Sequence, residues 1–288
     1  MAEFLSTLQG SPVLLMVAVA ALGLCVGSFL NVVIYRLPLM MEAEWRAECA
    51  SIEGREGPAR ERFNLFTPPS RCPSCKAPVR AWQNVPVVSW LVLRGKCAGC
   101  GTRISARYPM VEILGGALAA LMAWRFGYSW ALTAAMAYAW ALLALTFIDY
   151  DTQLLPDDIT LPLLWLGLIA KTQGVFTDLA SAVIGAAAGY LVLWSVYWLF
   201  KLIARKEGMG YGDFKLLAAI GAWTGWQVLP FVIVLSAGLG AVIGSIALWS
   251  SGKDSGSRIP FGPFLALGGN GALVWGPQAI HAWLRMPA

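Results

Sequence analysis

Residues 208–226 read GMGYGDFKLLAAIGAWTGW and place one carboxylate, Asp213, at the start of an apolar run. A charged side chain at membrane depth is costly and usually has a functional reason. The three glycines at positions 208, 210 and 212 carry no side chain, so another backbone or an extended substrate can approach Asp213 closely. This placement indicates a chemical role for Asp213. The alternative is that Asp213 only caps the helix that follows.

Apolar runs of this kind recur along the whole chain. With 58% hydrophobic residues, 13% charged residues and 14 tryptophans, the composition lies far from that of a soluble domain. A bilayer is crossed by about 20 apolar residues in a helix. The sequence therefore predicts an all-α polytopic membrane protein with about eight transmembrane helices. These spans are predicted at 12–34, 109–126, 129–148, 158–172, 178–201, 214–226, 228–249 and 262–284, of which 214–226 is short for a full crossing.

The basic residues predict how these helices are oriented. Twelve of the 21 Lys and Arg residues lie between Arg36 and Arg107, and six more fall in loops on the same side of an eight-span arrangement. Only Arg125, Lys171 and Arg285 fall on the other side. By the positive-inside rule, the segment from Arg36 to Arg107 is cytoplasmic and both termini are periplasmic. The net charge of +5 then reflects membrane topology, and no nucleic-acid partner is predicted.

A polar segment interrupts the spans after the first helix. We expect a first transmembrane helix in residues 1–37, a small cytoplasmic domain in 38–107 and a second transmembrane domain in 108–288. The cytoplasmic domain carries two CxxC pairs with 21 residues between them. Each pair can hold one side of a tetrahedral ion, as in a zinc ribbon. The four predicted ligands are Cys72, Cys75, Cys97 and Cys100.

Three alternatives to a structural zinc site remain for these cysteines. Two disulfides are disfavoured because a cytoplasmic domain keeps its thiols reduced. A catalytic zinc is disfavoured because four thiolates leave no position for a water molecule. A redox role is the third alternative.

Few residue types are left to carry catalysis. The only histidine is His281, at the outer end of the last span, so a nucleophile with a histidine base is not predicted. A serine nucleophile with a lysine base stays possible, although no lysine is expected inside a span. Asp149 ends the third span and Asp213 begins the sixth, so both are predicted at the cytoplasmic end of their helices. Two close carboxylates share one proton, so one acts as base on a water while the other donates to a peptide carbonyl.

The remaining polar residues in or beside the spans have simpler interpretations. Asp157 or Asp158 follows Pro156 and is expected to cap the fourth span. Glu112 in the second span is expected to make an interhelical hydrogen bond or a substrate contact, and Asn31 in the first span a packing hydrogen bond.

Several of these stretches together resemble the bifunctional type IV prepilin peptidase/N-methyltransferase family, which are bacterial aspartic proteases of the GxGD class. The resemblance covers nearly the whole chain, and the joint order of the motifs is more specific than any one of them. The motifs are Gly27-Ser28-Phe29-Leu30-Asn31-Val32-Val33-Ile34-Tyr35-Arg36-Leu37-Pro38, both CxxC pairs, Arg107-Tyr108-Pro109-Met110-Val111-Glu112, Phe147-Ile148-Asp149 with Leu155-Pro156-Asp157, and Gly210-Tyr211-Gly212-Asp213-Phe214-Lys215.

The resemblance implies that Asp149 and Asp213 are the catalytic pair of a transmembrane aspartic peptidase domain in 108–288. It implies a place in the bacterial inner membrane. The implied substrates are type IV prepilins and pseudopilins, each with a short basic leader before one apolar helix. The leader would be cut after a glycine at the cytoplasmic face. We further expect the positive leader to meet acidic surface residues, with Glu42, Glu44, Glu48 and Glu112 as candidates.

The family's second activity methylates the new N-terminal amine with S-adenosylmethionine. No dinucleotide-type glycine fingerprint supports this cofactor, so its site would be a nonstandard one. Residues Gly27 to Pro38 and Glu112 are candidates by resemblance, and their alternative role is helix packing with an interfacial arginine anchor. The candidates for the substrate or methyl-donor region are Gly27, Asn31, Arg36, Glu112, Gly210, Gly212 and Lys215.

Two further function classes were compared with the peptidase. A transporter also uses paired membrane carboxylates, but it predicts acids near the bilayer midplane and inverted repeats, which this sequence does not show. A purely structural subunit for pilus assembly is the third class.

Overall fold

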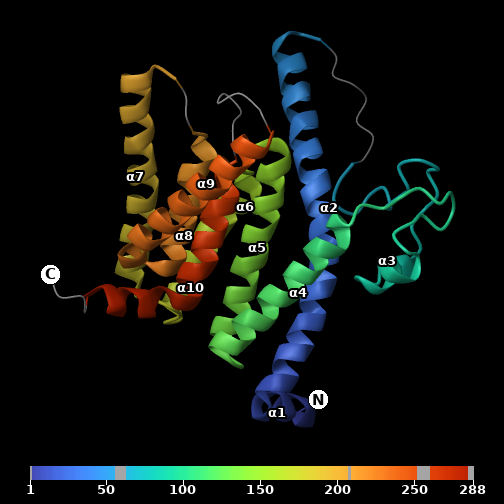
Figure 1. Ribbon diagram of the computed structural model, residues 1–288, viewed down its shortest axis with the longest axis horizontal. Coiled ribbons are helices and arrows are strands. Elements are labelled where there is room, and N and C mark those ends of the chain that lie inside the picture. The colour runs from blue at the N-terminus through green and yellow to red at the C-terminus, as the bar shows by residue number, and fades with distance from the viewer. Residues whose placement is uncertain (1, 56–62, 207–208, 252–259, 285–288) are drawn as a thin grey trace. The chain divides into compact units, whose positions relative to one another are not determined.

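The computed structural model describes residues 2–55, 63–206, 209–251 and 260–284 (Figure 1). Gly208 of the glycine run and residues 56–62 of the predicted cytoplasmic domain lie outside these ranges. Within the described ranges, every regular element is helical apart from two isolated β-bridges. The helices are α1 (Ala2–Gly10), α2 (Pro12–Ile52), η1 (Ala81–Asn84), α3 (Val88–Val92), α4 (Arg107–Phe126), α5 (Trp130–Thr152), α6 (Asp157–Thr172), α7 (Leu179–Ala204), α8 (Tyr211–Thr224), η2 (Trp226–Val228), α9 (Leu229–Ser251) and α10 (Gly262–Leu284).

The chain divides into two compact units, Met1–Tyr128 and Ser129–Ala288. The first contains α1 to α4 and both CxxC pairs, and the second contains α5 to α10. The predicted domain boundaries at residues 37 and 107 both fall inside the first unit. They were drawn where the sequence changes between apolar and polar, and they stay a prediction.

In the first unit, α2 and α4 pack together through small residues. A Cβ atom added at Gly23 would lie 2.5 Å from the backbone oxygen of Gly115, and one at Gly27 would lie 2.7 Å from Cα of Glu112. Only glycine permits so close an approach of two helix backbones. Helix α2 starts where the Ser11 side chain caps it and continues well beyond the predicted span, to Ile52.

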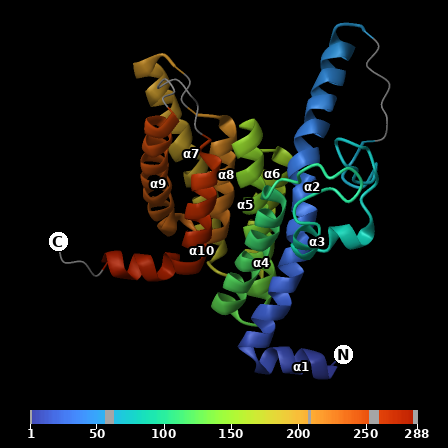
Figure 2. The ribbon, with the colours of Figure 1, turned by 45° about the vertical axis from the view of Figure 1, so that its right-hand side comes forward.

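In the second unit, α8 is the central helix. Eleven of its 14 residues are buried. It crosses α7 at Gly185 and Gly221, where an added Cβ would lie 2.4 Å or less from the facing backbone oxygen. Helix α10 packs against α5, α8 and α9 (Figure 2). Its first residue, Gly262, lies beside Asp149 near the end of α5.

Helices occur at all eight predicted positions, but not all are long enough to cross a bilayer. Among the described residues, five segments have the length and apolar character of a membrane span: Pro12–Ile52, Arg107–Phe126, Trp130–Thr152, Leu179–Ala204 and Trp226–Ile243. Helices α6 and α8 have 16 and 14 residues. At about 1.5 Å per residue they are shorter than the hydrocarbon core of about 30 Å. The count of eight spans therefore stays a prediction.

The expectation that no lysine lies inside a span is wrong for Lys201, in the last turn of the candidate span α7. Lys171 is a buried lysine in α6, which is not among the five candidate spans. This residue is in the last turn of α6 and is 4% exposed. Its Nζ donates to the backbone oxygen of Trp223, 2.7 Å away, and lies 4.6 Å from the centre of the Phe176 ring. The last carbonyls of a helix have no partner within the helix, so the long lysine side chain satisfies one at the end of α8.

Candidate functional site

The structure brings Asp149 and Asp213 together. Asp149 lies in the last turn of α5 and Asp213 is the third residue of α8, and they are 5% and 7% exposed. The two carboxylates are close enough to interact electrostatically. Two buried acids 64 residues apart in the sequence thus lie close enough to influence each other. A pair of this kind is suited to sharing one proton.

A third element, the start of α10, contacts Asp149. The backbone N–H of Gly262 donates to Oδ2 of Asp149 at 2.8 Å, in a buried position. A Cβ atom added at Gly262 would lie 2.6 Å from that same oxygen. The N–H groups of a first helical turn have no partner within the helix and favour an anion. Gly262 therefore both leaves room for the Asp149 carboxylate and binds it.

Sequence reasoning did not identify Gly262. The available signal was Phe261-Gly262-Pro263, where glycine and proline stand together at the start of a predicted span. Proline favours the first turn of a helix, which would place the exposed N–H groups of that turn here. Nothing in the sequence indicated which side chain these N–H groups would face.

The capping interpretation of Asp213 is wrong in its simple form. The N-cap residue of α8 is Gly210, with an extended backbone, and the helix begins at Tyr211. Asp213 is inside the first turn, where a carboxylate still gains from the helix dipole.

The glycine run does not leave open space at every position. At Gly212, an added Cβ would lie 2.8 Å from Cβ of Leu155, so the missing side chain makes room for Leu155. At Gly210, the nearest atom to an added Cβ is Oδ2 of Asp213, 3.9 Å away. Of these two glycines, only Gly210 lies beside the carboxylate with space for another group.

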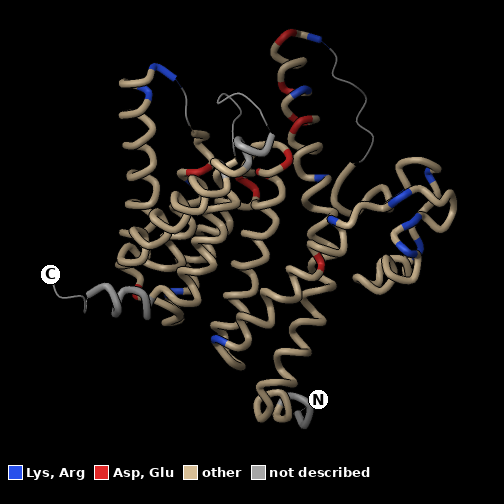
Figure 3. Tube along the Cα trace, viewed as in Figure 1, with Lys and Arg blue, Asp and Glu red and all other residues tan. Residues whose placement is uncertain are grey.

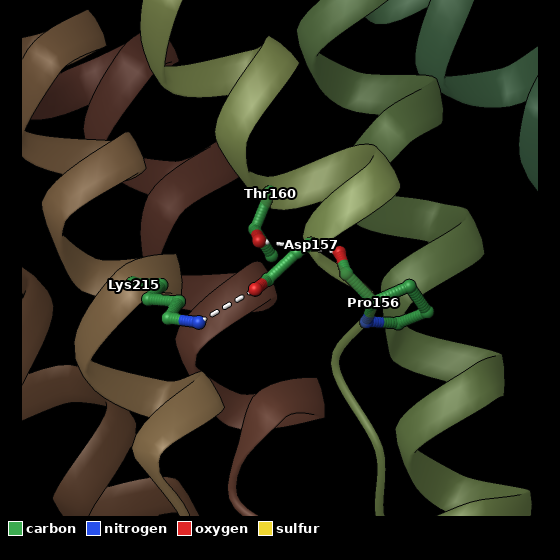
Figure 4. A network of polar contacts seen from close by, with 4 residues as sticks. All are labelled: Pro156, Asp157, Thr160 and Lys215. Carbon is green, nitrogen blue, oxygen red and sulfur yellow. Dashed lines mark hydrogen bonds and ion pairs between the residues drawn. The ribbon is translucent and has the colours of Figure 1, made fainter. Parts of the chain in front are cut away.

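Asp157 pairs with Lys215, which corrects the expectation that it caps α6. The N-cap position of α6 is Pro156, which makes no side-chain cap bond. Instead Lys215 Nζ donates to both carboxylate oxygens of Asp157, at 2.7 and 2.8 Å (Figure 4). The Thr160 hydroxyl donates to the Pro156 oxygen and holds the same turn. Segment 155–157 therefore contacts α8 at Gly212 and Lys215, one residue before and two residues after Asp213.

The four predicted metal ligands form one cluster. All four Sγ atoms lie within 4.8 Å of one another, with Cys72 and Cys100 3.8 Å apart and Cys75 and Cys97 4.0 Å apart. An ion bound tetrahedrally at about 2.3 Å from each sulfur sets the sulfurs about 3.8 Å apart. All the cysteines are free, so the disulfide alternative is not supported. The donor set therefore fits a metal ion.

The two CxxC pairs have the same local backbone structure. Cys72 N–H donates to Ala77 O and Cys97 N–H donates to Thr102 O, at 2.9 and 2.8 Å. The residue after each pair, Lys76 or Gly101, has a positive φ of 59° or 72°. Hydrogen bonds with Thr102 lower the pKa of the Cys100 thiol to about 6, whereas the neighbouring cysteine sulfurs raise the pKa of the Cys75 thiol to about 11, so the two thiols shift in opposite directions. A lower pKa favours the thiolate, the form that binds metals.

The methyl-donor candidates of the first unit make hydrogen bonds to other segments of that unit. Asn31 donates to the backbone oxygens of Gly27 and Tyr108. Arg36 is buried, donates to the oxygens of Asn64 and Pro68 at 2.8 and 2.6 Å, and lies 5.5 Å from the centre of the Phe63 ring. Glu112 accepts the backbone N–H of Val87 at 2.7 Å. These contacts agree with the packing and anchoring alternative.

Comparisons with known proteins match both units. The family model described as Bacterial Peptidase A24 N-terminal domain matches residues 21–126, and that of the Type IV leader peptidase family matches residues 136–245.

Curated relatives match over nearly their full length. A Prepilin leader peptidase/N-methyltransferase of Stutzerimonas stutzeri is 53% identical over 284 residues, which cover 98% of this chain and 97% of that protein. Proteins of the same name from Pseudomonas aeruginosa and Aeromonas salmonicida are 51% and 50% identical, and each match covers 98% of this chain and 97% or 98% of the relative. No solved structure gives a significant match.

Proposed function

The chain belongs to the type IV leader peptidase family, and we propose that Asp149 and Asp213 carry its peptidase chemistry. It is an aspartic peptidase that cleaves prepilins, and N-methylation is its second activity. The transporter alternative receives no support from the comparisons. The observation that carries the proposal is the pair of buried carboxylates contributed by α5 and α8. Its direct test is cleavage of a purified prepilin in detergent by the variants Asp149→Asn and Asp213→Asn.

The proposed reaction is hydrolysis of one peptide bond by a water held between the two aspartates. One carboxylate is ionised and takes a proton from the water as its oxygen attacks the peptide carbon. The other is protonated and donates to the carbonyl oxygen, which gives a neutral tetrahedral intermediate. The C–N bond then breaks as a proton passes to the leaving nitrogen. The Gly262 N–H favours the ionised form of Asp149, so we assign Asp149 as the base and Asp213 as the acid.

The proposed substrate is a prepilin or pseudopilin with a short basic leader, cut after a glycine. Space beside Gly210 and Asp213 supports an extended leader at this position. Glu42, Glu44 and Glu48 are exposed on α2 and remain candidates to meet the basic leader. Glu112 is a weaker candidate because it is buried and accepts the Val87 N–H.

The proposed location is the bacterial inner membrane with both termini periplasmic and the aspartates at the cytoplasmic face. Eight spans would include α6 and α8 as short crossings within the helical bundle. The charge distribution supports this orientation, since 12 of 21 basic residues fall between Arg36 and Arg107.

The proposed cofactors are a structural Zn²⁺ in the cysteine cluster and S-adenosylmethionine for methylation. A bound zinc would hold the two CxxC pairs together, as the sulfur distances favour. The candidate methyl-donor residues Asn31, Arg36 and Glu112 direct hydrogen bonds to the protein itself. They do not define a fit for S-adenosylmethionine, and we assign no methyl-transfer step to them.

Gly262→Ala is expected to lower kcat for prepilin cleavage about 10²-fold with a small change in KM, because a displaced general base loses most of its contribution. The added methyl would lie 2.6 Å from the Asp149 oxygen, so the carboxylate must move. Gly271→Ala in the same helix is the matched control, because its added Cβ has only one ordinary contact, at 3.6 Å. A Gly262→Ala enzyme with kcat like that of Gly271→Ala would remove the positioning role.

The Asp157–Lys215 pair is expected to position α8 beside the catalytic Asp213. The pair is half exposed, so its effect on stability is about 1 kcal/mol or less. We expect Asp157→Lys or Lys215→Asp alone to lower kcat about tenfold, and the double charge swap to restore it to within about threefold, since surface pairs re-form with modest energies. Cleavage rates of the three variants measure this. If Lys215 instead contacts the substrate, the double swap will not recover activity.

A further inference from the structure

The segment around α3 exposes several large apolar side chains within eleven residues, 82–92. These side chains, called the α3 apolar face, have between 45% and 68% of their surface exposed; they are Trp82, Val85, Val88, Leu91 and Val92. Large apolar residues gathered on the surface of a small domain indicate an interaction site.

The surroundings of this face are strongly basic. From Phe63 to Val111 the sequence contains no Asp or Glu. It contains seven basic residues: Arg71, Lys76, Arg80, Arg94, Lys96, Arg103 and Arg107. Figure 3 shows the Lys and Arg positions spread over the loops around α3, with no acidic position among them. Charge of one sign beside an apolar face favours a partner that is both apolar and anionic.

The start of α3 is held beside a membrane-spanning helix. The Val87 N–H donates to Glu112, which is buried and is the sixth residue of α4. Helix α4 is one of the candidate membrane spans. At about 1.5 Å per residue, the contact lies less than about 10 Å along α4 from its first residue. Figures 1 and 2 agree that α3 lies level with α4 and not beyond its N-terminal end.

We propose that the α3 apolar face inserts into the surface of the lipid bilayer, with the flanking Lys and Arg side chains bound to anionic phospholipid headgroups. A short amphipathic element at this depth buries its apolar side chains at the boundary between headgroups and acyl chains. Each basic residue near an anionic surface strengthens the binding. In α4, Tyr108, Met110 and Ile113 are also exposed.

A bilayer fits this surface better than a substrate does. The proposed prepilin leader is itself basic, so the seven basic residues of this segment would repel it. The insertion would hold the cysteine cluster at the membrane surface. In the proposed orientation, α3 meets the cytoplasmic leaflet.

The test replaces Leu91 by the photo-reactive residue p-benzoylphenylalanine in the full-length protein, reconstituted in nanodiscs containing phosphatidylglycerol and phosphatidylcholine. After irradiation, we expect a lipid adduct on the peptide containing residue 91, found by mass spectrometry. The same probe at Ser51, exposed at the end of α2, is the matched control and should give at least about tenfold less adduct. Equal adduct at both positions, or a crosslink at residue 91 only to protein or to added prepilin, would overturn the proposal.

A second arm separates insertion from loss of folding. The variant Val88→Glu/Leu91→Glu should retain its metal and its cleavage rate in detergent, and should cleave prepilin more slowly in nanodiscs. An equal rate in nanodiscs would count against a bilayer contact. The lipid adduct needs no peptidase activity, so it should persist in Asp213→Asn, which keeps this test independent of the proposed catalytic pair.

Discussion

Asp149→Asn and Asp213→Asn are each expected to lower kcat for prepilin cleavage by at least about 10³-fold, equivalent to about 4 kcal/mol in the barrier. The carboxylates lie together in a buried site, and the reaction needs one ionised and one protonated group. An amide neither takes a proton from water nor donates one as a carboxylic acid does. The two variants remove different roles of one unit, so their double variant should be no slower than either alone.

Asp151→Asn is the matched control for this pair. Asp151 is exposed and lies two residues from Asp149 on the same helix, so its loss should leave kcat within about twofold, as for most surface substitutions. Cleavage of a purified prepilin, followed by the mass of the product, measures all three variants. Methylation of a precleaved pilin should persist in Asp149→Asn if the two activities use separate sites. Cleavage at a normal rate by either variant of the pair would show that the catalytic assignment is wrong.

The sequence predicted this site because its features are local or follow from topology. Apolar runs gave the helix positions, and the ends of two runs predicted that Asp149 and Asp213 lie at the same membrane face. Four cysteines in two CxxC pairs predicted a cluster because each pair fixes two ligands on one short loop. These inferences use only spacing and charge, which can be read from the sequence without knowing the tertiary contacts.

The contacts that shape the site could not be read from spacing. Gly262 meets Asp149 across 113 residues, and any glycine in a span is an equally good candidate for such a contact. Leu155 fills the space at Gly212, where the pattern alone indicated room for a substrate. Lys171 sits near the end of α6, but its partner is a carbonyl of α8, 52 residues away. Each of these three contacts depends on which helices pack together, and residue spacing does not reveal that.

Cys72→Ser and Cys97→Ser are each expected to lose the bound metal and to unfold the loops that carry the two CxxC pairs. Four thiolates bind structural zinc with apparent free energies of about 10–16 kcal/mol, most of which stabilises the fold of a small domain. Among the described residues this segment has no β-strand, only short turns, the helices η1 and α3, and two isolated β-bridges, Arg71 with Pro78 and Lys96 with Arg103. Metal content by mass spectrometry should fall from about one zinc per chain to near zero.

Cys49→Ser is the control, because Cys49 is exposed on α2 and is not part of the cluster. It should keep the zinc and the hydrogen-exchange protection of the loops between Arg71 and Arg103. In the two cluster variants that protection should be lost, while α5 to α10 form a separate compact unit and should stay protected. Full protection without metal would show that the cysteine cluster folds by other contacts. Loss of protection in both units would show that the metal stabilises the whole chain, since a structural ion contributes only to the unit that binds it unless the two units fold cooperatively.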